Sequence, residues 1–391
     1  DRLGDFLSVK DFGAKGDGVT DDTIAIQEAE SYVSSRKIRL YFPTGVYLTS
    51  QGIKPKSNTV YYGDGIDSTI IRLINGDNET NACDVFQQDT VLIFDMTIDG
   101  NYPNRTDVPT VPFSHGGCAL RIKESKNIVA IRVKATNPFA HSIDINGERY
   151  HVDYNPEVWS PNPSSNVWLD QCIAEKGRDD NITTHQCHDI WITNCLSKDP
   201  LGGYVVNNNN CLEIDDGSRN IFVSNFVGIG GYSGVQIKGH ATTPAPYNIN
   251  MANIRCINNY IGFECRHTSF YGASDGGFSS SARGITVDGL TIVSPAVSDT
   301  WLHDETITAP SCALFIRSYD DVQFSNVRIY TDNAGDKAGD YKAPQELSFP
   351  PVRIIGGARN VLINGIAING ANWVKSDTLG VVYVAEQSTK N

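Results

Sequence analysis

Short stretches of this chain alternate apolar and polar residues, and the same arrangement returns about every 20 to 40 residues. One unit, from Arg178 to Cys195, shows the arrangement clearly as a half-buried strand, a tight corner and a second strand. Aligning the second strand of each unit on its first apolar residue gives nine anchors: Val91, Ile128, Val167, Ile190, Ile221, Ile249, Ile285, Val322 and Val361. The pattern therefore predicts repetition of structure rather than of exact sequence.

Two more positions of the unit are apolar in all nine copies. Two residues after the anchors stand Ile93, Ala130, Leu169, Ile192, Val223, Met251, Val287, Phe324 and Ile363. Five residues after the anchors stand Met96, Val133, Cys172, Cys195, Phe226, Ile254, Leu290, Val327 and Ile366. The residue before this last column is asparagine in four units: Asn194, Asn225, Asn253 and Asn326. Asparagine tolerates the left-handed backbone of a tight corner, so the chain should turn there.

Strands of this kind, joined by corners and recurring at this spacing, are typical of a solenoid in which each unit buries its apolar face by stacking on its neighbours. With strands about 4.8 Å apart along the axis, the aligned columns become continuous ladders inside the coil. We therefore predict an all-β fold, a single-stranded right-handed parallel β-helix of roughly nine to eleven rungs. A β-sandwich with long loops is the alternative, but it would not keep separate columns apolar in register.

The first residues predict a capping segment, residues 1–40, ahead of the coil formed by residues 41–391. Thr20 or Asp21 can cap an α-helix that runs to about Ser35. Candidates for the buried side of this helix are Ile24, Ile26, Ala29 and Val33. Long loops are expected near residues 101–114, 147–165, 268–282 and 331–350.

Composition narrows the classes of partner. The 391 residues are 40% hydrophobic and carry a net charge of -13, which argues against duplex DNA or an anionic membrane surface as the main partner. The negative charge therefore leads us to expect no nucleic-acid partner. The chain has no run of about 18 apolar residues, so we expect no membrane insertion. Its nine cysteines include no Cys-x-x-Cys spacing. We therefore predict cysteines that pack in the core, with no metal and no cofactor.

The first strand of each unit also aligns, with inward apolar pairs such as Ile143/Ile145 and Leu212/Ile214. The alternate residues should then point outward and be exposed. One outward column is Arg121, Asp144, Thr183, Glu213, Gln236 and Glu264. The column beside it is Lys123, Asn146, His185, Asp215, Lys238 and Arg266. One interpretation of these columns is a ladder of ion pairs on a solvated sheet.

A catalytic groove is the other interpretation. Glu213 and Asp215 stand two residues apart on one strand, about 6.6 to 7 Å, which overlaps the roughly 6.5–9.5 Å between the carboxyls of inverting glycosidases. One carboxyl of such a pair must be protonated, and like charges on one face raise one pKa. Asp144 and Glu264 are alternates, and Asp180 lies at the entrance of its strand. The candidates for substrate binding are His185, Lys238, Arg266, Glu264, Gln236 and His240.

Two groups of motifs resemble a known family. The stretch from Val9 to Asp22, Val-Lys-Asp-Phe-Gly-Ala-Lys-Gly-Asp-Gly-Val-Thr-Asp-Asp, resembles the opening of pectate-lyase-like β-helix proteins, as do residues 40–48 and 62–65. In that superfamily the first helix plugs the open end of the coil. Residues 3–14, 179–185, 212–218 and 237–240 resemble tailspike and appendage depolymerases of bacteriophages, including preneck appendages of small Bacillus phages.

This resemblance implies a homotrimeric spike of the virion that acts at the host cell surface, where it binds and cleaves a bacterial surface polysaccharide or teichoic acid. Three mechanisms stay open: hydrolysis by Glu213 and Asp215, β-elimination with Lys238 or Arg266 as the base, or binding without turnover. The chain has no Gly-His-Gly between Asp180 and Lys238, which departs from the polygalacturonase pattern and argues against pectin as the substrate.

Overall fold

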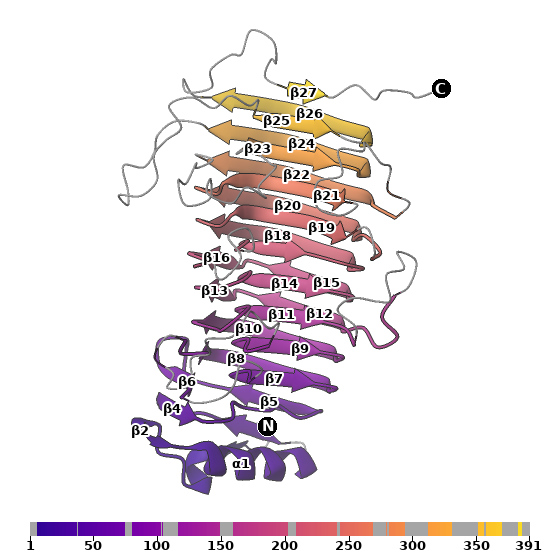
Figure 1. Ribbon diagram of the computed structural model, residues 1–391. Coiled ribbons are helices and arrows are strands. Elements are labelled where there is room, and N and C mark those ends of the chain that lie inside the picture. Colours follow the sequence, from indigo (N-terminus) through magenta and orange to yellow (C-terminus); the bar gives the residue numbers. More distant parts are fainter. Residues whose placement is uncertain are drawn as a thin grey trace, which may run out of the picture.

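A computed structural model of the protein describes residues 6–36, 38–74, 80–102, 104, 116–148, 159–201, 209–240, 243–268, 279, 281–293, 312–330, 351–355, 357–369 and 382–384. These residues form two β-sheets that wind together around one long apolar core, with an α-helix at the N-terminal end (Figure 1). All their strand pairings are parallel, so the chain rises along a single axis as a right-handed β-helix, as predicted.

The first sheet has 17 strands. Its N-terminal strands are β1 (Phe6–Ser8), β2 (Asp17–Asp21), β3 (Arg39–Tyr41), β4 (Gly45–Thr49), β5 (Thr59–Tyr62), β6 (Thr69–Leu73), β8 (Asp89–Asp99) and β10 (Lys126–Thr136). The remaining strands are β12 (Ser165–Asp170), β13 (Ile173–Glu175), β15 (His188–Thr193), β16 (Leu196–Lys198), β18 (Arg219–Ile229), β20 (Tyr247–Ile257), β22 (Arg283–Val293), β24 (Asp320–Tyr330) and β26 (Arg359–Asn369).

The second sheet has 10 strands and carries the polar columns. They are β7 (Cys83–Phe86), β9 (Leu120–Lys123), β11 (Ile143–Asn146), β14 (Ile182–His185), β17 (Leu212–Ile214), β19 (Ser233–His240), β21 (Ile261–Thr268), β23 (Cys312–Arg317), β25 (Val352–Ile355) and β27 (Val382–Val384).

The predicted core columns are confirmed. All nine anchors pair in register on neighbouring rungs, from Val91 with Ile128 to Val322 with Val361. The first eight anchors are fully buried. The last unit is less covered, and its Ile366 is 37% exposed because the first sheet has no further rung beyond it among the described residues. Registered, buried ladders of this kind exclude the sandwich alternative.

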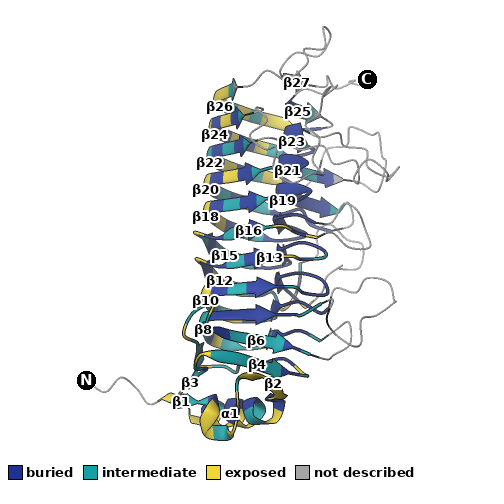
Figure 2. Cartoon of the chain, turned by 90° about the vertical axis from the view of Figure 1, so that its left-hand side faces the viewer, coloured by how far each residue is buried: buried dark blue, intermediate teal, exposed yellow. Residues whose placement is uncertain are grey.

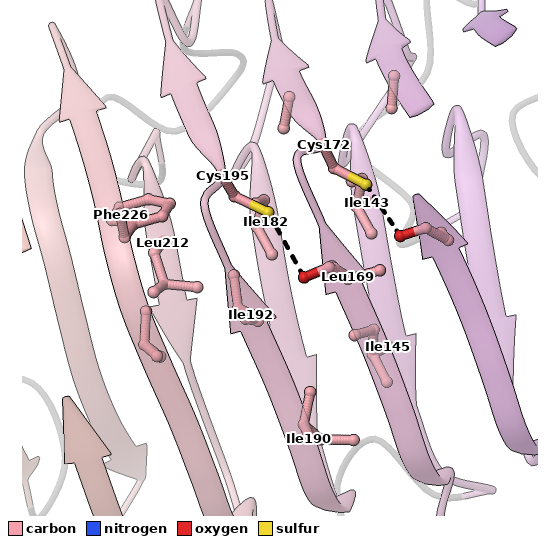
Figure 3. Packing of buried hydrophobic residues seen from close by; sticks show 14 of the residues in the cluster. Ile143, Ile145, Leu169, Cys172, Ile182, Ile190, Ile192, Cys195, Leu212 and Phe226 are labelled. Atoms are coloured by element: carbon pink, nitrogen blue, oxygen red, sulfur yellow. Dashed lines mark hydrogen bonds between the residues drawn. The ribbon is translucent and has the colours of Figure 1, made fainter. Parts of the chain in front are cut away.

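Cys172 and Cys195 pack in this core as predicted. Figure 3 shows both sulfurs directed at the backbone of the adjacent rung, beside Phe226 and the apolar residues of the second sheet. The Sγ of Cys172 lies 3.3 Å from the carbonyl oxygen of Ala130, and that of Cys195 lies 3.7 Å from the carbonyl oxygen of Leu169. All nine cysteines are buried free thiols, so they act as small core residues.

Two positions in every unit of the first sheet turn through the left-handed backbone region. Directly before the anchors these residues are Thr90, Asn127, Asn166, Asp189, Asn220, Asn248, Gly284, Asp321 and Asn360. Four residues after the anchors they are Asp95, Arg132, Gln171, Asn194, Asn225, Asn253, Gly289, Asn326 and Gly365. Asparagine suits the corner because its amide also bonds the next rung, as from Asn225 to Asn194 at 2.9 Å.

The predicted capping helix is α1 (Thr23–Arg36), which lies across the N-terminal end of the coil after a 3-10 turn at Val9–Phe12 (Figure 1). Asp21 caps its start, because the Oδ1 of Asp21 accepts the N–H of Thr23 at 3.0 Å, and the carbonyl of Asp22 accepts the first intrahelical bond, from Ile26 at 2.9 Å. Ile26 is buried as predicted, with Ala29 and Val33. The placement of Ile24 on the buried side is wrong, since this residue is 65% exposed. At about 100° per residue, it points roughly opposite to Ile26.

The predicted loops near residues 101–114, 147–165, 268–282 and 331–350 fall largely outside the described residues. Within the described part of the chain, no helix is long and apolar enough to cross a membrane.

Glu30 links the capping helix to the coil and gives a first prediction. It is 3% exposed, and its Oε1 accepts the N–H of Lys54 at 2.6 Å. Burial raises the pKa of Glu30 to about 7. Because this folded-state pKa exceeds the ordinary value, the protonated carboxyl favours folding at low pH, and this contribution is lost as the pH rises through 7. We predict that Glu30→Gln stabilises the fold at pH 8 by about 1–3 kcal/mol, with little gain at pH 5.

Denaturant unfolding at both pH values, followed by circular dichroism, measures this effect. Glu28→Gln on the exposed side of α1 is the matched control and should leave the pH dependence unchanged. A Glu30→Gln protein that loses as much stability between pH 5 and pH 8 as the parent would contradict the prediction.

Candidate active site

The outward side of the second sheet carries the predicted polar columns in the predicted register. One column pairs, rung by rung, Arg121, Asp144, Thr183, Glu213, Gln236 and Glu264. The neighbouring column pairs Lys123, Asn146 and His185, and then Lys238 and Arg266. Asp215 continues that column between His185 and Lys238, and its N–H donates to the carbonyl of Thr184 at 2.8 Å. The stacking therefore gathers the candidate residues on adjacent rungs.

The prediction that these columns are exposed is wrong. Asp144 and His185 are fully buried, Glu213 and Asp215 are each 1% exposed, and Figure 2 shows β19 as buried along nearly its whole length. Strand alternation defines only the side of the sheet that a residue faces. Other parts of the chain decide whether solvent reaches that side. The amide of Asn210, from a turn, links the neighbouring rungs because it donates to Asp180 at 2.7 Å and to Gln236 at 3.3 Å.

Lys238 holds two carboxylates at the centre of the cluster. Its Nζ lies 2.6 Å from Oε1 of Glu213 and 3.1 Å from Oδ2 of Asp215. Burial by itself would raise the pKa of both carboxyls, but the positive charges of Lys238 and His185 and the hydrogen bonds to the carboxylates together outweigh it and lower both values, that of Asp215 strongly. Although burial opposes its charge, the two carboxylates raise the pKa of Lys238 well above its ordinary value. All three groups are therefore charged at neutral pH.

His185 adds a second buried cation. Its Nε2 lies 3.3 Å from Oδ2 of Asp215, and its Nδ1 lies 3.9 Å from Oδ1 of Asp144. Burial would lower the pKa of this imidazole, but hydrogen bonding to Asp144 and Asp215 raises it to about 10. His185 is therefore an imidazolium that keeps the neighbouring acids ionised, and Thr183 also donates to Glu213, at 3.0 Å.

Asp180 has the opposite state. It is 2% exposed, and its Oδ1 accepts from the backbone N–H and the side-chain amide of Asn210 at 2.8 and 2.7 Å. Burial is the main reason that its pKa is raised well above the ordinary value, and the negative charge of Glu213 and a hydrogen bond to that carboxylate add to it. Burial also raises the pKa of the adjacent Asp179 to about 6. Asp180 is therefore a protonated acid bonded to the ionised Glu213.

The charge states of Glu213 and Asp215 differ from those that the sequence predicted. We expected like charges to leave either Glu213 or Asp215 protonated, but Lys238 lies between them and both pKa values fall. The protonated carboxyl belongs to Asp180, on the rung below, where no ammonium lies at contact distance among the described ion pairs. The acid and the ionised carboxylate thus lie on adjacent rungs rather than on one strand.

His141 is a member of the cluster that the sequence analysis missed. Its Nδ1 accepts the N–H of Asp180 at 3.3 Å, and its Nε2 lies 3.6 Å from Oδ2 of Asp179. His141, Asp180 and Asn210 each stand two residues before the first inward residue of their strands, and backbone hydrogen bonds between the turns keep them in register. Aligning the turns as well as the strands would have found both His141 and Asn210.

The remaining predicted residues lie at the edge of the cluster. Glu264 accepts from Gln236 and from the hydroxyl of Ser233, and the Nε of Arg266 lies 3.6 Å from its Oε2. His240, the last residue of β19, is held by Asp216, whose Oδ2 lies 2.9 Å from its Nδ1. The side chains of Arg266 and His240 are 30% and 38% exposed, and that of Lys238 is 11% exposed. These three side chains form the solvent-facing border of the cluster.

Among the described residues, three groups bring possible metal ligands within 4.8 Å of one another: His141 with Asp179 and Asp180, His185 with Glu213 and Asp215, and Asp215 with Asp216 and His240. In the first group, the amide of Asn210 already donates to Oδ1 of Asp180, and the backbone N–H of Asp180 donates to Nδ1 of His141. In the second group, the Nζ of Lys238 contacts both Glu213 and Asp215. In the third group, Nδ1 of His240 and Oδ2 of Asp216 contact each other. A metal ion would have to displace these donors, so we assign none.

Comparison with known proteins is consistent with the sequence motifs. Residues 6–99 match the family model described as rhamnogalacturonase A/epimerase, pectate lyase-like. Over 377 residues the chain is 31% identical to the preneck appendage protein of Bacillus phage PZA and equally to the pre-neck appendage protein of Bacillus phage phi29. Each match covers 95% of this chain and 42% of the relative. The chain therefore spans less than half the length of these relatives.

Solved structures agree. The N-terminal fragment of bacteriophage phi29 gene product 12 gives a TM-score of 0.81 at 30% identity, covering 97% of this chain and 59% of that chain. A mannuronan C-5 epimerase A-module from Azotobacter vinelandii gives a TM-score of 0.61 at 18% identity, covering 97% of this chain and 100% of that chain, which shows the fold alone. The chain is therefore a homologue of the preneck appendages of Bacillus phages, which are virion components, and it has the pectate-lyase-like β-helix fold.

Proposed function

We propose that this chain is part of a homotrimeric depolymerase of the virion, which binds a bacterial surface polysaccharide or teichoic acid and cleaves it by hydrolysis. The observation that carries the proposal is the burial of Asp180 and Glu213 on adjacent rungs, in surroundings that raise the pKa of Asp180 and lower that of Glu213. Carboxyls whose environments push their pKa values apart can supply the acid and the base of hydrolysis. Buried charges add little to stability, which favours a functional reason for the cluster.

In the proposed reaction, Glu213 takes a proton from the attacking water while Asp180 gives its proton to the leaving oxygen. The bond from the water oxygen to the scissile centre forms as the bond to the leaving oxygen breaks, so each cut adds one water to the products. Lys238 and His185 keep Glu213 ionised and supply positive charge where negative charge develops. Arg266, at the solvent-facing border, meets the incoming polymer first.

Elimination is less well supported. It would need Lys238 or Arg266 as a neutral base, yet neighbouring carboxylates outweigh burial and raise the pKa of both cations. Neither side chain then offers a lone pair near neutral pH.

Binding without turnover is the second candidate. The burial of Glu213 and Asp180 favours it, because a polymer reaches these carboxyls only past the partly exposed Lys238 and Arg266. A receptor-binding role would use the cationic border and leave the carboxyl pair as a structural element.

Mass analysis of polymer fragments tests the hydrolytic mechanism. Incubation with surface polymers from candidate Bacillus hosts should give fragments that gain one water per cut, with ¹⁸O incorporated from labelled water. Asp180→Asn and Glu213→Gln should each slow cleavage by about 10²–10⁴-fold, because each variant removes one proton-transfer group.

Asp84→Asn is the matched control. Asp84 stands in the same outward column, where it pairs with Arg121 at 2.9 Å, three rungs away from Asp180. It should keep normal cleavage. Unsaturated fragments would contradict hydrolysis and favour elimination. Intact polymer that stays bound to the parent and to both site variants would favour the binding role.

His185→Gln tests the electrostatic role of the buried imidazolium. Removing this cation should raise the pKa of Asp215 and Glu213, so the acidic limb of the pH profile of kcat/KM should move up by about 1 unit. His188→Gln is the control, because His188 pairs with Asp189 at 2.7 Å at a corner outside the cluster. An acidic limb that stays in place in folded His185→Gln protein would refute this role.

A further inference from the structure

The outer face of the first sheet carries a line of apolar side chains that do not belong to the core. It runs rung by rung along the axis through β5, β8, β10, β12, β15 and β18, which lie side by side in Figure 1. The residues pair in register and are Val60, Leu92, Val129, Trp168, Trp191 and Phe222. Trp168 is 42% exposed and Phe222 is 36% exposed.

A second, shorter line lies two residues further along strands β3, β5, β8 and β10. It pairs Tyr41, Tyr62, Phe94 and Ile131, none of which is buried. Phe6, 56% exposed, packs edge-on against Tyr41 at 5.8 Å between ring centroids. We call these two lines together with Phe6 the apolar stripe.

The stripe is confined to the N-terminal half of the coil. Beyond Phe222 the same outward position holds Asn250, Thr286 and Gln323. The β-helix therefore does not require an apolar residue at this position. Monomeric proteins rarely expose apolar patches larger than a few hundred Å², and larger ones mark interaction surfaces.

The orientation of the rings argues against a sugar chain as the partner. Trp191 and Phe222 stack on each other with centroids 5.7 Å apart and planes 10° apart. Tyr41 and Tyr62 stack in the same way at 4.9 Å and 19°. Aromatic faces that cover one another along the axis offer their edges to solvent, whereas a sugar ring would need an open face. The indole N–H of Trp168 already donates to the hydroxyl of Thr193 at 2.8 Å. Apolar ring edges suit a packed protein surface.

The net charge of the chain and the length of the stripe indicate that the partner is another copy of this chain. The chain has a net charge of -13, so copies of it repel unless they meet through a neutral face. The residues of the stripe are uncharged, and two of the neighbouring cations are paired within the chain, Arg132 with Asp95 and Lys126 with Asp89, while Arg39 stands at the N-terminal end of the longer line. The longer line spans five rung intervals, about 24 Å, a length that fits the apolar centre of an interface of about 800 Å² per partner.

We propose that the apolar stripe is the surface through which copies of this chain pack side by side, with their coil axes aligned. A straight line of side chains along the axis of one coil matches the same line on another coil over its full length. The inference rests on the proposed homotrimer for the number of copies, and it adds which face of the coil they use.

Light scattering after size-exclusion chromatography at about 10 μM tests the proposal. The parent chain should elute as a trimer, and the double variant Trp168→Lys/Phe222→Lys should elute as a monomer, since like charges in an apolar interface strongly oppose association. Leu362→Lys is the matched control. Leu362 occupies the same outward position and is 54% exposed, but polar residues separate it from the stripe, so the trimer should persist.

Circular dichroism separates loss of association from loss of fold. If the lysine variant is not folded, the milder Trp168→Gln/Phe222→Gln variant replaces it and should weaken association at least 10-fold. A folded variant that keeps the mass of the parent would overturn the choice of face. A monomeric parent would overturn the proposal itself. Neither result bears on polymer cleavage, which the fragment analysis measures separately.

Discussion

Parallel hydrogen bonding between successive rungs is the constraint on which the rest of this structure depends. It fixes neighbouring strands about 4.8 Å apart and forces each side chain to meet its counterparts on the rungs above and below. The buried anchors from Val91 to Val322 gain from this rule because like apolar groups pack well on one another. The corner asparagines gain from it because the side-chain amide of one can donate to the asparagine on the neighbouring rung, as that of Asn225 donates to Asn194.

The same rule makes a polar column costly, because it stacks charges that would otherwise stay apart in water. The chain offsets this cost locally by placing positive and negative side chains next to one another. Lys238 and His185 lie against Glu213 and Asp215, and each opposite charge keeps its neighbour ionised. Asp180 lies at the end of this balanced group, where burial raises its pKa and the negative charges of Glu213 and Asp179 add to the effect.

The two sheets also divide the outer surface between two kinds of chemistry. The candidate active site lies on the outward side of the second sheet, and the apolar stripe lies on the outward side of the first. Copies that pack through the stripe would therefore leave the polar cluster uncovered. The neutral stripe and the charged cluster each agree with the role proposed for its face, since association needs apolar contact and cleavage needs preorganised charge.

The sequence by itself determined the fold and the order of the candidate site residues. Each rung copies the pattern of the one before, so local alternation was enough to place Glu213, Lys238 and Arg266 on adjacent rungs in register. Only the tertiary structure decided that this face is buried, that Asp180 rather than Asp215 carries the proton, and that His141 belongs to the cluster. These features depend on contacts between turn residues of different rungs, and on the summed effect of charges far apart in the chain. Neither is encoded in the alternation of a single strand.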